Sequence, residues 1–91
     1  MNKEKNIARE IRLLAEDTTS LTQNSAITAY NMASFAADVL EDPRPVVDTK
    51  NKDAARYLAV ASLFYYQPRM RELALELWPQ VLKYPYKVTE Q

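Results

Sequence analysis

Carboxylates are the strongest candidates for chemistry in this chain, because its 91 residues include no histidine and no cysteine. Nucleophile–imidazole pairs and His or Cys metal sites are therefore excluded, and without glycine there is no glycine-rich phosphate loop. Glu72 and Glu76 lie one helical turn apart and could hold a hard cation or act as an acid/base pair. A solvated helix face explains the same spacing, and the sequence offers no orienting partner. We expect no enzyme activity, no metal and no cofactor.

Basic residues form a second candidate site, for nucleic acid. They lie at the starts of two predicted helices, as in a helix-turn-helix domain: Lys50, Lys52, Arg56, Arg69 and Arg71. Against this, Asp48 and Asp53 lie within the first group, and no Lys or Arg occurs between Arg12 and Arg44. Twelve basic and twelve acidic residues give a net charge of zero, which removes bulk attraction to a polyanion. A DNA-binding regulator remains an alternative.

Aromatic residues are abundant, with six Tyr, two Phe and one Trp. We expect Phe64 in the core. Tyr65 and Tyr66 point about 100° apart on a helix, so one small core is not expected to bury both rings, and such side chains are enriched at protein interfaces. An alternative is a small-ligand pocket between helices, lined by Tyr57, Phe64 and Trp78.

Neutral polar residues mark one face of the second predicted helix. An exposed helix usually carries Lys and Glu, whereas neutral amides cost less to bury than charges do. This face therefore suggests a contact surface, although an ordinary solvated face explains it as well. Its residues are Gln23, Asn24, Asn31, Ser34 and Asp38. We predict Asn31, Tyr65 and Tyr66 as protein-contact residues.

The elements that position these residues are predicted to be helices. The fold class is all-α, a small bundle of three main helices plus a short, Pro-kinked C-terminal helix. The apolar spacing and the prolines predict four helices. The first covers 3–16, and the second covers 20–40 and begins with a Ser20/Gln23 capping box. The third begins within 49–53 and ends at Gln67, and the fourth covers 68–78. A short turn holds Val81 and Leu82. Residues 1–84 form one domain, and 85–91 are predicted to be a flexible tail.

The stretch from Ala54 to Tyr66 is apolar around nearly its whole helical circumference, so we expect it to be the central helix. The core is predicted to come from the second and third helices, packed closely through two rows of small residues. These rows are Ala26, Ala29, Ala33 and Ala37, and Ala55, Ala59 and Ser62. The apolar surplus on the third helix predicts self-association, most simply as a symmetric dimer.

These features predict a class of function but no specific partner. The amino terminus leads into no apolar signal core, which predicts a cytoplasmic protein, and residues 18–37 are too polar to span a bilayer. We predict a non-enzymatic protein-interaction module, a regulator, inhibitor or adaptor, that binds another protein or itself and no membrane. Small chains of this kind are common among bacterial and phage accessory proteins.

Overall fold

Four α-helices and a short 3₁₀ helix make up the computed structural model, which describes residues 2–18, 24–43, 47–65 and 67–83. The helices are α1 (Asn2–Thr18), α2 (Asn24–Glu41), α3 (Val47–Phe64) and α4 (Pro68–Leu77), and the 3₁₀ helix η1 spans Pro79–Lys83. The described ranges contain no strand. The predicted all-α bundle with a short C-terminal helix is confirmed.

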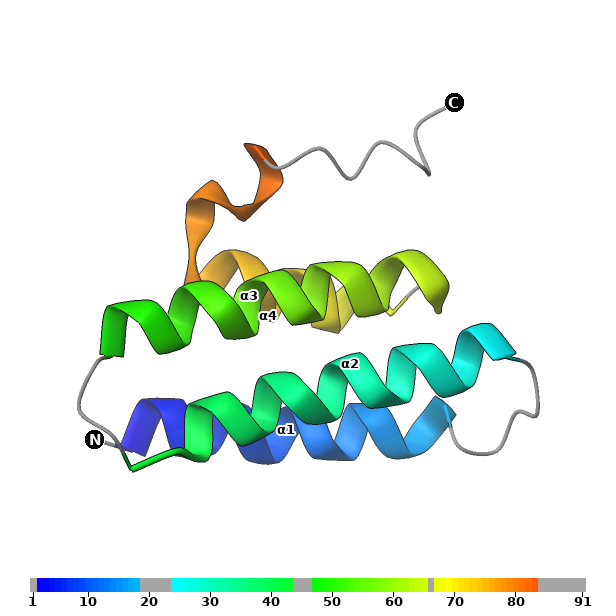
Figure 1. Cartoon of the computed structure of the whole chain (residues 1–91), viewed down its shortest axis with the longest axis horizontal. Helices are drawn as coiled ribbons and strands as arrows, with labels where there is room; N and C mark the ends of the chain where they lie inside the picture. The colour runs from blue at the N-terminus through cyan, green and yellow to red at the C-terminus, as the bar shows by residue number, and fades with distance from the viewer. Residues whose placement is uncertain (1, 19–23, 44–46, 66, 84–91) are drawn as a thin grey trace.

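Each helix runs antiparallel to the one before it, and α2 and α3 are drawn in front of α1 and α4 (Figure 1). The extents of 35 × 28 × 17 Å fit two layers of helices. The largest contact between elements is that of α2 with α3, followed by α1 with α2 and α3 with α4. The layer formed by α2 and α3 therefore has one broad face that neither α1 nor α4 covers.

Helix boundaries differ from the predicted ones mainly at α3. This helix begins at Val47, two residues before the predicted window, and ends at Phe64 rather than at Gln67. Pro45 precedes the start in the sequence, where a proline does not disturb helical hydrogen bonds. The helix begins before all four residues that the sequence offered as caps, which are Asp48, Thr49, Asn51 and Asp53. The predicted start of the second helix, with its Ser20/Gln23 capping box, lies outside the described residues, as does the predicted flexible tail.

The start and end of α4 match the prediction closely. Gln67 is the N-cap with extended backbone (φ −139°), and its side-chain Oε1 accepts a hydrogen bond from the backbone N–H of Arg69 at 3.2 Å. Pro68 occupies the first turn, where its missing N–H costs nothing. The helix ends before Trp78-Pro79, and η1 follows with Val81 buried.

The core includes buried residues of α2 and α3, as predicted, but it also draws on α1, α4 and η1. The largest fully buried side chains come from α1, α3, α4 and η1, because α2 contributes mainly alanines. They are Ile11, Leu58, Met70, Leu73 and Val81. Phe64, predicted to be in the core, is 46% exposed. It is the last residue of α3 and lies on the same side of that helix as Tyr57, away from the side that faces α4.

All seven members of the two predicted rows of small residues are buried, and α2 with α3 is the largest contact between elements. On the helical wheel, however, Ala55, Ala59 and Ser62 lie on the side of α3 that also carries Lys52. Lys52 lies over Trp78 at the end of α4, so this row is directed toward α4. Ala54 and Ala61 lie nearer to Tyr57, which contacts α2.

Candidate contact surface

Exposed large apolar side chains are the first indication of a functional surface. A buried polar group or an exposed apolar cluster is more informative than a single exposed residue. Among the described residues these side chains come from α1, α2 and α3. They are Leu13 (60% exposed), Ile27 (51%), Tyr30 (37%), Phe35 (46%) and Phe64 (46%).

The outer side of α2 carries three adjacent exposed residues, Ile27, Asn31 and Phe35. They are spaced by one helical turn, so they form one continuous strip along the helix. The buried alanines of α2 lie on the opposite side, and Asn31 points most directly away from them on the helical wheel. Asn31 is thus flanked along the helix by two large apolar side chains.

Two aromatic residues of α3 extend this strip. The rings of Phe35 and Tyr57 meet edge to face, with centroids 5.7 Å apart and planes at 61°. Phe64 lies seven residues after Tyr57, on the same side of α3 and about 10 Å further along it. Because α2 and α3 are antiparallel (Figure 1) and Phe35 meets Tyr57, the seven-residue spacing sets Phe64 at about the level of Thr28 on α2, one residue after Ile27 in the sequence. We call Ile27, Asn31, Phe35, Tyr57 and Phe64 the α2–α3 face.

The fold does not keep the predicted contact residues and the predicted pocket residues as two separate groups. Asn31, from the predicted contact set, and Tyr57 and Phe64, from the predicted ligand pocket, share the α2–α3 face. Tyr65 is partly buried and packs against the core, and Tyr66 lies outside the described residues. Ile27 and Phe35 were not predicted as contact residues, because apolar residues on an Ala-rich helix are first expected to be buried.

Trp78, the third predicted pocket residue, lies elsewhere. The Lys52 ammonium lies 5.3 Å from the centroid of its ring and the Arg56 guanidinium 5.9 Å. Both cations are within the range of a cation–π interaction. On the wheel of α3, Lys52 and Arg56 lie on a different side from Tyr57 and Phe64, so the fold does not bring Trp78 together with them.

The predicted nucleic-acid residues divide between the two ends of the bundle. Lys50 and Lys52 lie in the first turns of α3, whereas Arg69 and Arg71 lie at the start of α4, next to the end of α3 (Figure 1). Several of these groups already have partners. The Lys50 ammonium donates to the backbone carbonyl of Asp42, and Lys52 and Arg56 lie over Trp78. The five residues therefore do not form one basic surface.

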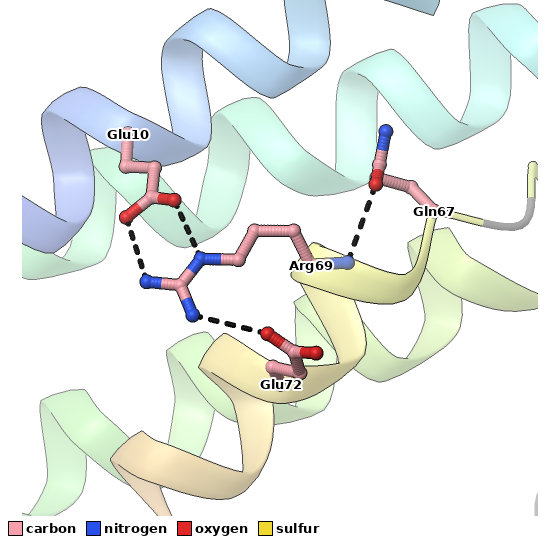
Figure 2. A network of polar contacts seen from close by, with 4 residues as sticks. All are labelled: Glu10, Gln67, Arg69 and Glu72. Carbon is pink, nitrogen blue, oxygen red and sulfur yellow. Dashed lines mark hydrogen bonds and ion pairs between the residues drawn. The ribbon is translucent and has the colours of Figure 1, made fainter.

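Arg69 is held in an ion network that joins α4 to α1, as Figure 2 shows. Its guanidinium donates to both carboxylate oxygens of Glu10, at 2.6 and 3.1 Å, and to Glu72 at 3.1 Å. The hydrogen bond from Arg69 lowers the pKa of Glu10 despite partial desolvation. Arg69 and Glu10 are 59 positions apart in the sequence, so an argument from spacing along one helix cannot detect their contact.

A second ion network joins α1 to the end of α2. Arg12 donates to both carboxylate oxygens of Glu41, at 2.6 and 3.2 Å, and to Asp38 at 2.6 Å. Beside it is an open hollow of 430 Å³, lined by Lys5, Arg9, Arg12, Leu13 and Glu41. Charges of both signs line this hollow, and Leu13 lies on the side of α1 away from the core.

Other kinds of site receive no support from the described residues. Within 2–18, 24–43, 47–65 and 67–83, no three acidic, His or Cys side chains gather as they would around a metal ion. Over the same ranges, no helix combines the length and hydropathy needed to cross a bilayer. Glu72 and Glu76 are both exposed, and Glu72 is engaged with Arg69.

Comparison with known proteins adds no further assignment: no family model, no curated protein and no solved structure matches this chain.

Proposed function

We propose that this chain is a small, non-enzymatic cytoplasmic protein that acts by binding a partner protein through the α2–α3 face. The observation that carries the proposal is the placement of Ile27, Phe35 and Phe64. All three are about half exposed and lie on one face around Asn31. Aromatic and aliphatic side chains around a neutral amide are typical of the centre of a protein interface, where charged residues are depleted.

The electrostatics of α2 support this role. No Asp, Glu, Lys or Arg occurs between Asn24 and Ala37, so burial of this helix surface desolvates no charge. Asp38 and Glu41, near its end, are already paired with Arg12. The face therefore has an apolar centre with a charged rim at one end.

DNA binding has less support as an alternative, because Arg69 is committed to two carboxylates and the basic residues lie at both ends of the bundle. A gel shift at low salt tests it directly. A shift that weakens with salt and is lost in Lys52→Ala would favour the alternative over the proposal.

Affinity capture from the source cell tests the proposal itself, using the wild type, Phe35→Glu and Leu13→Glu as baits. Leu13 is the matched control because it is more exposed than Phe35 but lies on α1, outside the face. We expect proteins other than the bait to be retained by the wild type and Leu13→Glu and lost with Phe35→Glu. Identical recovery with all three folded baits would contradict the proposal.

A further inference from the structure

We propose that the α2–α3 face pairs with the same face of a second copy of this chain, in a two-fold symmetric dimer centred on Asn31. This inference rests on the proposed function, since it names a partner for the same surface. It also assigns the predicted self-association to the α2–α3 face, rather than to the whole circumference of the third helix. Of the large apolar residues in the described part of that stretch, only Phe64 is exposed.

Charge is the first argument for a second copy. A partner that depends on ion pairing would find no opposite charge along α2 between Asn24 and Ala37. Beyond this stretch, the Asp38 and Glu41 carboxylates are each 2.6 Å from Arg12 of the same chain. Two copies of α2 bring neutral surfaces together, so no like charges oppose each other along this stretch.

The spacing along α2 is self-complementary. Ile27 lies four residues before Asn31 and Phe35 four residues after it. An antiparallel pair of α2 helices with its two-fold axis at Asn31 therefore sets Ile27 of each copy against Phe35 of the other. The two Asn31 side chains meet at the axis, where each amide can both donate and accept a hydrogen bond. A polar Asn at such a position can fix the register of paired helices.

The same two-fold axis also pairs residues of α3 with residues of α3 in the second copy. Because Phe35 contacts Tyr57 and the helices are antiparallel, Asn31 lies level with a point midway between Tyr57 and Phe64. Rotation about an axis at that level brings Tyr57 of each copy against Phe64 of the other. One symmetry operation thus pairs the exposed residues of α2 and pairs the partly buried Tyr57 with the exposed Phe64 of α3, although the two spacings are independent features of the sequence.

The size of the face predicts a weak dimer. Helices α2 and α3 have 18 residues each, so each is about 27 Å long, with axes about 8–10 Å apart. Such a surface buries roughly 500 Å² per subunit, at the lower end of specific interfaces. We expect dissociation in the micromolar range, and therefore a concentration-dependent equilibrium between monomer and dimer.

Cysteine cross-linking tests the register, because the chain has no cysteine of its own. Asn31→Cys places two thiols at the axis, so mild oxidation is expected to give a dimer that a reductant reverses. In Ile27→Cys the two thiols are eight residues apart along the paired helices, about 12 Å, which is beyond disulfide reach. Mixing Ile27→Cys with Phe35→Cys is expected to restore cross-linking, whereas Leu13→Cys alone gives none.

Sedimentation of the cysteine-free chain at several concentrations provides the independent readout. The wild type and Leu13→Glu are expected to dimerise and Phe35→Glu to stay monomeric. A wild type that is monomeric at hundreds of micromolar, or equal cross-linking at all cysteine positions, would overturn the dimer. If a different protein still binds the wild type and is lost with Phe35→Glu, only the dimer fails and the proposed function stands.

Discussion

At the scale of single residues, two arginines link helices through ion pairs. Arg12 joins α1 to α2 and Arg69 joins α1 to α4, in both cases through a guanidinium that binds a carboxylate with two hydrogen bonds. Bidentate geometry gives these pairs a defined orientation. All the participating side chains are more than a third exposed, so each network stabilises the fold modestly.

Glu10→Gln tests the Arg69 network through its pH dependence. The hydrogen bond from Arg69 lowers the pKa of Glu10 in the folded state, so the native state favours the ionised carboxylate. This contribution to stability is present above the unfolded pKa, about 4.3, and is lost as the pH falls through the lower folded pKa. Thermal unfolding should therefore show a lower Tm for Glu10→Gln at pH 7 and little difference from wild type near pH 2.

Glu76→Gln is the matched control, because Glu76 is an exposed carboxylate on α4. Its Tm should follow that of the wild type over the same pH range. A difference between Glu10→Gln and the wild type that persists undiminished at low pH would show that the carboxylate's charge is not what stabilises the native state.

At the scale of elements, the inner side of α2 consists mainly of small residues. Five of its six buried residues are alanines, and Leu40 is the sixth. Alanine favours the helix and lets neighbouring backbones approach closely, but it leaves little apolar volume on the inner side. Meanwhile Ile27 and Phe35 point outward. The helix therefore shows the reverse of the usual amphipathic distribution of size, with small residues inside and large ones outside.

Ala33→Leu tests this packing. Ala33 is fully buried on the inner side of α2, so three extra carbon atoms have no space without moving a neighbouring helix. We expect a loss of about 1–3 kcal/mol in the free energy of unfolding, measured by urea denaturation. Glu76→Leu adds a leucine at an exposed helical position and should change stability much less. Equal effects would mean that α2 does not depend on small residues at its inner side.

At the scale of the whole molecule, four helices share one core, and the large buried side chains come from the elements around α2. Leu58 is fully buried in α3, between the α2 and α4 sides of that helix. Leu13, by contrast, is exposed at 60% on α1. The two leucines therefore separate the role of apolar residues in folding from their role at a surface.

Leu58→Ala and Leu13→Ala form a matched pair for this distinction. Leu58→Ala is expected to reduce the free energy of unfolding by about 2–5 kcal/mol, because it leaves a cavity in the core. In a chain of 91 residues this is a large share of total stability. Leu13→Ala should stay within about 0.5 kcal/mol of wild type. Similar losses for both variants in denaturant titrations would contradict the assigned core.

The sequence by itself determined the helices, because helical periodicity and proline act locally. Pro68 marks the start of α4 as predicted, and the predicted break at Pro79 coincides with the start of η1. The apolar spacing located the bodies of all four α-helices. The early start of α3 at Val47 was missed because several consecutive residues could each cap that helix.

Only the tertiary structure decided which sides of those helices are covered. Residues 54–65 have apolar side chains all around, yet α2 and α4 cover most of them, and much of the exposed apolar surface lies on α2 instead. Exposure depends on the positions of neighbouring helices, and these depend on packing between residues far apart in the sequence, such as the core residues Ile11, Leu58 and Leu73. No periodicity within one helix records such contacts, so the α2–α3 face emerged only from the packed bundle.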